Sequence, residues 1–269
     1  MIKDITIGQY YPTNSFIHRL DPRTKLTATF LYIIFLFVIN NYIGYALATL
    51  FLVGVIAMSK IPVMYILRGL KAIVFIICFT VVINIFWTKG ETLWQLGFLK
   101  VSKEGLILAS KMGIRLVLLV CATSVMTLCT STIALTDGLE MIMNKVPLLK
   151  KVSHEVSMMM SIALRFIPTL TDETDKIIKA QKSRGADFES GNIFKRAKAF
   201  IPILVPLFVS AFQRANELAM AMESRCYQGG VNRTRMKELK YSQSDIKTYV
   251  SLIFIFALMF ATRYVPNVW

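Results

Sequence analysis

LTATFLYIIFLFVINNYIGYALATLFLVGVIAMS, residues 26–59, contains no Asp, Glu, Lys, Arg or His. At ~1.5 Å per residue, a helix of this length crosses the ~30 Å hydrocarbon core of a bilayer more than once. Asn40 and Asn41 lie near its middle and suit a tight turn between two helices. The stretch therefore predicts two membrane spans, Leu26–Ile39 and Tyr42–Met58.

Three further uncharged runs extend this pattern. They are Ala72–Thr88, Leu116–Thr136 and Thr248–Thr262, of which the last is short but is flanked by Lys247 and Arg263, which can reach the two interfaces. Hydrophobic residues make up 55% of the chain, and its mean hydropathy is +0.56. These features predict an all-α integral membrane protein with about five transmembrane helices.

The net charge of +15 lies mostly outside the predicted spans. Residues 133–245 alone hold 17 Lys and Arg against 12 Asp and Glu. Because positive charge marks the cytoplasmic side of membrane proteins, we expect a cytoplasmic N-terminus and a C-terminus on the other side, and no nucleic-acid partner. Lys111 and Arg115, at the start of the fourth span, are expected to extend to the interface.

Four segments follow from this pattern. Residues 1–25 form a cytoplasmic N-terminal segment, 26–132 hold transmembrane helices 1–4, 133–245 form a cytoplasmic region of long coupling helices, and 246–269 hold the C-terminal span.

Three helices are predicted in residues 133–245, at Leu135–Val146, Val152–Arg184 and Ile193–Tyr227. The two long ones are apolar at first and charged towards their ends, and each contains proline, which kinks or breaks a helix. Methionine is frequent here and suits either core packing or an adaptable partner surface. Ala199–Gln213 is uncharged, so an alternative topology embeds it in the membrane.

Each long helix ends in a serine-arginine motif. One interpretation is an ordinary helix end, where arginine complements the macrodipole and glycine takes the left-handed position. The other is a pair of docking points for two similar soluble subunits, because an arginine fork binds a carboxylate or carbonyl through two donors. The motifs are Ser183-Arg184-Gly185 and Ser224-Arg225-Cys226.

The sequence lacks the residues that several kinds of binding site and reaction require. There is no phosphate-cradling GxxxxGK[ST] motif, and the predicted spans hold no acidic residue of the kind an ion-driven carrier needs. The only histidines are His18 and His154, and the four cysteines have no metal-ligand spacing, so no metal site is predicted. No catalytic set is visible, and we predict that the chain is not an enzyme.

Four segments resemble the transmembrane T component of energy-coupling factor (ECF) transporters, the EcfT/CbiQ-like family. The family usually has Ala-Arg-Gly at both arginine motifs, whereas Cys226 replaces the second glycine here, and Gly229-Gly230 is an alternative end for that helix. The matching segments are residues 20–26, which contain the N-terminal motif residues Asp21, Pro22, Arg23 and Lys25; residues 163–168 leading to 181–185; residues 202–208; and residues 219–225.

The resemblance implies a coupling subunit of an ABC importer in the cytoplasmic membrane of a prokaryote. Two ATP-binding cassette subunits would hold ATP and Mg, a small membrane S component would bind a vitamin, and this chain would join them within the lipid bilayer, without a cofactor of its own. Each arginine motif would dock on one ATPase. The S component would contact apolar residues of the long helices, namely Met158, Met159, Ile162, Phe166, Ile203 and Leu207.

Two alternatives stay open. The runner-up is the dedicated T component of a nickel or cobalt importer, on which the sequence is silent because substrate would be held on another subunit. A membrane scaffold or an enzyme acting on lipid is a different class, and it would need a reactive centre that the sequence does not display.

Overall fold

The computed structural model describes residues 10–88, 91–96, 99–148, 150–186, 188, 193–229 and 239–262. The chain divides into two compact units. We call Gly8–Leu139 with Glu238–Trp269 the membrane bundle, and Glu140–Lys237 the long-helix unit. Helices dominate both, so the predicted all-α membrane fold is confirmed.

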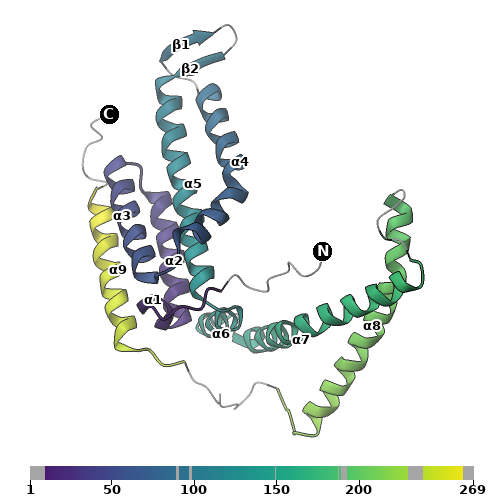
Figure 1. Ribbon diagram of the computed structural model, residues 1–269. Helices are drawn as coiled ribbons and strands as arrows, with labels where there is room; N and C mark the ends of the chain where they lie inside the picture. Colours follow the sequence, from purple (N-terminus) through teal and green to yellow (C-terminus); the bar gives the residue numbers. More distant parts are fainter. Residues whose placement is uncertain are drawn as a thin grey trace. The chain divides into compact units, whose positions relative to one another are not determined.

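The membrane bundle is built around four helices. α2, α3, α5 and α9 run side by side, and α4 packs along α5 (Figure 1). Its elements are α1 (Phe16–Arg19), α2 (Pro22–Val38), α3 (Tyr42–Ser59), α4 (Val63–Trp87), β1 (Thr92–Leu96), β2 (Leu99–Ser102), α5 (Lys103–Cys129), the start of α6 (Thr132–Met143) and α9 (Gln243–Ala261).

The core of the bundle lies where these four helices meet. Phe35 of α2 and Phe256 of α9 stack with their ring centroids 4.2 Å apart. The Tyr32 hydroxyl donates to the Ala48 carbonyl of α3 at 3.2 Å, so the buried polar atom is satisfied. The other buried core residues are Leu36, Ile39, Tyr45, Leu52, Leu118, Ala122, Leu252 and Met259.

The first two predicted spans form as two helices, of which α2 begins at Pro22 rather than at Leu26. α2 and α3 are separated by a short turn at Asn40 and Asn41. The Asn41 side-chain amide donates to the Thr262 carbonyl at 2.8 Å, which ties this turn to the end of α9. Asparagine therefore serves here as a tertiary link as well as a turn residue.

The predicted C-terminal end of the fourth span, Leu116–Thr136, is wrong. α5 stops at Cys129, and α6 begins at Thr132, earlier than the predicted Leu135. Thr130 has an extended backbone, and the Ser131 hydroxyl accepts from the Ala134 N–H at 3.3 Å, as a helix N-cap does. Hydropathy does not change across this break, so the uncharged run concealed it.

Two features were not anticipated between the second and fourth spans. α4 contains a bend of 59° between Val63–Lys71 and Ile73–Trp87. Beyond α4, β1 and β2 pair as an antiparallel hairpin with an irregularity between Thr92 and Trp94.

Among the described residues, four helices are long and apolar enough to cross a membrane, or five if the bent α4 counts as one span. They include α3, α5 and α9, as predicted, and Lys198–Glu223 of α8. α2 has 17 residues, at the lower limit for a span. The apolar character of α8 matches the alternative topology considered for Ala199–Gln213.

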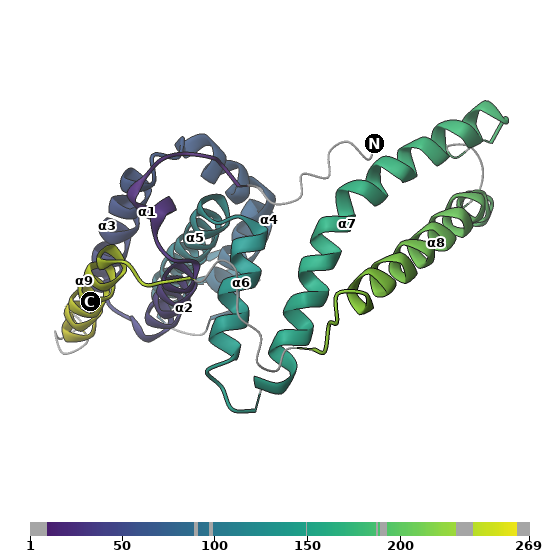
Figure 2. The ribbon, with the colours of Figure 1, turned by 90° about the horizontal axis from the view of Figure 1, so that it is seen from below.

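The long-helix unit consists mainly of α7 (Lys150–Ser183) and α8 (Ile193–Glu223). The two helices lie side by side and run in opposite directions (Figure 2). α7 continues through Pro168, and α8 continues through Pro202 and Pro206, so none of these prolines ends a helix. Each helix therefore extends as one element to its arginine motif.

Candidate functional site

The end of α7 is closed by a Schellman motif. The Ala186 N–H donates to the Gln181 carbonyl at 3.0 Å, and the Gly185 N–H donates to the Lys182 carbonyl at 3.0 Å. These are the two bonds that define the motif, and they require a left-handed residue after the helix. Gly185 supplies it with φ +84°. Arg184 is thereby held at the last helical turn.

The end of α8 is closed in the same way. The Tyr227 N–H donates to the Met222 carbonyl at 3.0 Å, and the Cys226 N–H donates to the Glu223 carbonyl at 2.8 Å. Cys226 occupies the left-handed position with φ +54°. The substitution of cysteine for glycine therefore leaves the cap intact, and the alternative helix end at Gly229-Gly230 is wrong at Gly229, while Gly230 lies outside the described residues.

The two arginines occupy equivalent places. Arg184 and Arg225 each fall one residue before the left-handed position, and each is preceded by a serine whose hydroxyl donates to a backbone carbonyl of its own helix at 3.1 Å. Both arginine side chains are exposed. Neither guanidinium makes a hydrogen bond or an ion pair with the described residues, so all donors of both forks are available to a partner.

The antiparallel packing places the motifs at opposite ends of the helix pair. At one end, the Tyr227 hydroxyl donates to the Met158 sulfur at 3.0 Å, so the Arg225 motif lies beside the first turns of α7. Met158 and Ser183 are 25 positions apart in α7, which corresponds to roughly 38 Å at ~1.5 Å per residue. The two arginines are therefore separated by about the length of the helix pair.

A polar contact fixes the middle of the pair. Arg214 of α8 and Glu173 of α7 form an ion pair at 3.0 Å. Hydrogen bonds from Ser210 and from Arg214 lower the pKa of Glu173, although partial burial opposes them. The carboxylate thus stays charged and helps to set the register of the two helices.

The predicted S-component contacts fall in different surroundings. Met158, Ile162 and Phe166 line a groove of about 680 Å³ between α7 and α8, which Arg225 also lines. Met159 points outward and is 58% exposed, Leu207 is half-buried, and Ile203 is buried at 3% exposed. Of the six, Met159 is thus the one that is plainly exposed, and Ile203 packs inside the protein.

Sequence reasoning missed the main apolar surface of the long-helix unit. Between Phe200 and Phe212 of α8, seven large apolar side chains are each more than 40% exposed. Their spacing of four and of one residue places them on one broad face of a helix. Helical periodicity could have identified this face, which we call the α8 apolar face: Phe200, Ile201, Leu204, Val205, Phe208, Val209 and Phe212.

The N-terminal motif has a different location, at one end of the membrane bundle. Asp21 caps α2 by accepting from the Arg23 N–H at 2.8 Å, and its carboxylate accepts from Arg23 Nε at 3.0 Å and Nη2 at 2.7 Å. Burial raises the pKa of Asp21, but the bonds from Arg23 outweigh it and hold the pKa below its usual value. Pro22 occupies the first helical turn, where its missing N–H leaves no hydrogen bond unmade.

This motif joins three parts of the bundle that are distant in sequence. The Asp21 N–H donates to Asp245 in the first turn of α9 at 2.9 Å, and Arg23 lies 4.0 Å from the Tyr241 ring centroid. Lys25 Nζ donates to the carbonyl of Cys129 at 2.9 Å, which satisfies the open end of α5. Asp21, Arg23 and Lys25 therefore link the starts of α2 and α9 with the end of α5.

Arg115 differs from its expected role. Its Nη2 donates to the Tyr45 hydroxyl at 2.7 Å and to the Ile39 carbonyl at 3.2 Å. The side chain is half-buried and so does not extend freely to the interface. It joins α5 to the ends of α2 and α3, a use of charge typical of residues that face the interior of a membrane bundle.

The chain is similar in sequence to known transport proteins. Residues 13–237 match the family model described as CbiQ, cobalt transport protein. The energy-coupling factor transporter transmembrane protein EcfT of Ruminiclostridium cellulolyticum is 55% identical over 256 residues, which cover 95% of this chain and 96% of that protein. The chain belongs to the EcfT/CbiQ family.

Other EcfT proteins agree over nearly their full length. The one from Clostridium kluyveri is 56% identical over 247 residues, with 91% of this chain and 92% of that protein covered. The one from Bacillus subtilis is 47% identical over 264 residues, with 98% and 100% covered. The resemblance drawn from the motifs is confirmed, and this EcfT-family chain is a multi-pass transmembrane component of ECF transporters.

Proposed function

We propose that this chain is the coupling subunit of an ECF-type importer for vitamins or related micronutrients. It would link two ATP-binding cassette subunits, which bind ATP and Mg and carry out hydrolysis, to a small S component that binds the substrate. The chain itself would be non-catalytic and would hold no cofactor. The distribution of basic residues supports a cytoplasmic N-terminus and a cytoplasmic long-helix unit in a prokaryotic cytoplasmic membrane.

One observation carries this proposal. Arg184 and Arg225 have the same cap geometry, the same exposure and no partner among the described residues, and they lie at opposite ends of one rigid helix pair. Two equivalent anchors suit two similar ATPase subunits, one for each arginine. An unpaired arginine fork suits a carboxylate or a row of carbonyls in a partner groove.

The α8 apolar face supports the second half of the coupling role. A patch of large, exposed apolar side chains is costly in water and marks a contact with protein or lipid. We assign the S component to this face, together with Met159 of α7. Movement of the arginine ends by the ATPases would then reach the S component through the same two helices.

The decisive experiment is a pull-down of the tagged full chain from native membranes in mild detergent. Wild type is expected to retain two ABC-type ATPases and small membrane proteins, whose identity would reveal the substrates. Arg184→Glu with Arg225→Glu should lose both ATPases and uptake while inserting normally. Lys179→Glu, an exposed change on α7 near the first motif, is the matched control and should behave as wild type. If the double variant recovered as much of both ATPases as the wild type does, the proposal would be contradicted.

A nickel or cobalt importer is the second candidate. The family model that matches residues 13–237 carries the description cobalt transport protein. The relatives between 45% and 56% identical are instead named EcfT, which favours the first candidate. The small membrane proteins recovered in the same pull-down distinguish the two, since they hold the substrate site.

A further inference from the structure

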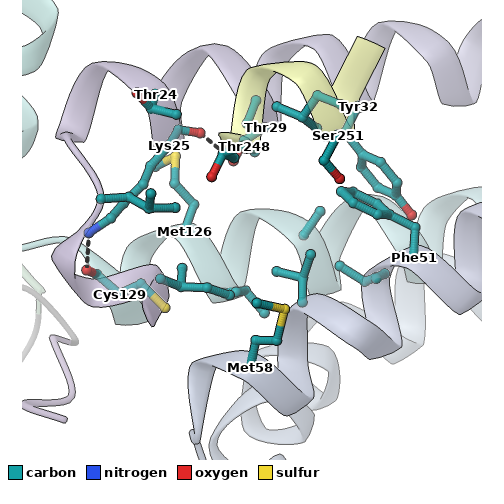
Figure 3. A pocket seen from close by; sticks show the side chains of 18 of the residues that line it. Thr24, Lys25, Thr29, Tyr32, Phe51, Met58, Met126, Cys129, Thr248 and Ser251 are labelled. Atoms are coloured by element: carbon teal, nitrogen blue, oxygen red, sulfur yellow. Dashed lines mark hydrogen bonds between the residues drawn. The ribbon is translucent and has the colours of Figure 1, made fainter. Parts of the chain in front are cut away.

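The membrane bundle contains a cavity of about 330 Å³ that the coupling role does not use. Side chains from α1, α2, α3, α5 and α9 line it, among them Tyr32, Phe51, Met58 and Met126 (Figure 3). Its volume lies at the lower end of the ~300–1,000 Å³ typical of small-molecule sites. All of its walls belong to one compact unit, so it is a property of the bundle itself.

Several polar groups in the wall of this cavity are already satisfied, whereas the buried Thr24 hydroxyl has no hydrogen-bond partner among the described residues. The Thr29 and Thr248 hydroxyls each donate to a carbonyl of their own helix at 2.9 Å. Lys25 Nζ donates to the carbonyls of His18 and Cys129, and the dashed line in Figure 3 marks the second bond. The cavity therefore offers mainly apolar surface, and a cavity of that kind favours an apolar occupant over water.

The mouth of the cavity faces the same surroundings as the outer surface of the bundle. Among its lining residues, Met58 of α3 is 51% exposed, and Ser251 of α9 is also exposed. The same two helices carry outward apolar side chains such as Leu50 and Ile253, each 69% exposed. In a multi-pass membrane protein these side chains face acyl chains, so lipid has direct access to the cavity.

One cation stands at this mouth. Lys247 lines the cavity, is exposed, and lies in the second turn of α9, close to the level where the helix enters the bilayer. Its ammonium makes no hydrogen bond or ion pair with the part of the chain that the structure describes. An apolar cavity with an unpaired ammonium at its rim matches an acyl chain that carries an anionic headgroup.

We propose that this cavity binds one acyl chain of an anionic phospholipid, whose phosphate is held by Lys247. The site goes beyond the coupling role and does not depend on it. A lipid held there would contact α2, α3, α5 and α9 together and would stabilise their packing.

The test uses phosphatidylglycerol with a diazirine in one acyl chain, mixed into phosphatidylcholine vesicles that hold the full chain with its bound subunits. After illumination, mass spectrometry should find the label on Met58 and Met126 of the cavity wall. Ala28→Phe, which fills the cavity, should abolish this labelling, whereas Ala57→Phe on the outer face of α3 should not. Lys247→Gln should reduce it about five-fold, and Lys71→Gln should leave it unchanged.

A second filling variant keeps the test decisive. Ser251→Phe narrows the mouth from an exposed position on α9, so it should insert normally even if Ala28→Phe does not. Label found only on outward residues such as Leu50 and unchanged by either filling variant would mean ordinary boundary lipid and would overturn the proposal. Loss of cavity labelling whenever another subunit is bound would assign the cavity to that protein instead.

Discussion

Gly185 and Cys226 hold the same left-handed backbone position, with φ values of +84° and +54°, at the ends of two antiparallel helices. Each residue directly follows an arginine, and the same pair of backbone hydrogen bonds closes the helix around it. A glycine and a cysteine therefore produce the same local geometry. The left-handed conformation costs a non-glycine residue ~1–2 kcal/mol, so Cys226 lowers the stability of the α8 end.

The first prediction concerns the stability cost of Cys226 at a positive φ. Cys226→Gly should raise the stability of the α8 end by about 1 kcal/mol and leave ATPase recovery unchanged, because the cap geometry persists without the steric cost. Cys226→Val should lower both the stability of the α8 end and the recovery of ATPase, since a β-branched side chain is poorly tolerated at positive φ. Thermal unfolding in detergent and the pull-down measure both effects. Equal ATPase recovery by the valine variant would show that the cap does not position Arg225.

The α8 apolar face provides the second prediction. Leu204→Ser with Phe208→Ser should leave both ATPases bound but should lose the S component and uptake, because these exposed side chains lie away from the arginine motifs. The matched control is Val152→Ser, which also removes an exposed apolar side chain but lies at the start of α7. Retention of the S component by the double variant would remove this face from the coupling role.

The third prediction compares a buried ion pair with an exposed one. The Asp21 and Arg23 side chains are 3% and 10% exposed, whereas those of Glu173 and Arg214 are 25% and 37% exposed. Asp21→Ala should cost about 3–5 kcal/mol because it strands a buried guanidinium. Glu173→Ala should cost less than ~1 kcal/mol. Thermal unfolding of the two variants under the same conditions checks the ranking, and equal losses would contradict it.

The fourth prediction is a pH dependence at His18. Its Nε2–H donates to the Tyr11 carbonyl at 3.0 Å, and its Nδ1 lies 2.7 Å from the Ser15 hydroxyl. Burial lowers the pKa of His18 below its ordinary 6.5, and nearby Lys25 adds to the effect. The neutral ring therefore stabilises the fold fully above pH 6.5, and this contribution is lost as the pH falls through the lowered pKa.

We expect the unfolding temperature to fall between pH 7.5 and pH 5.5, since protonation of His18 favours the unfolded chain in this range. His18→Gln removes the titrating group, so its unfolding temperature should vary less over the same interval. An unchanged slope in this variant would assign the pH dependence to other groups.

The sequence by itself determined the membrane class and the family. Long uncharged runs leave no alternative to burial in lipid, because burying so much apolar surface in a water-soluble domain of this size is not feasible. It also contains the signal for the start of α2, since a cap at Asp21 followed by Pro22 is a local pattern. The two arginine motifs were visible for the same reason, because a helix end depends on neighbouring residues.

What the sequence left open depended on residues far apart in the chain. The break after Cys129 is completed by Lys25, and the cap at Asp21 is joined by Asp245, more than 200 residues away. No local pattern reports such contacts, since they exist only when the helices pack. The tertiary structure alone decided that α7 and α8 run antiparallel, and hence that their arginines face opposite ends. It also decided that Cys226 would adopt a conformation its side chain disfavours, because the closing hydrogen bonds outweigh the steric cost.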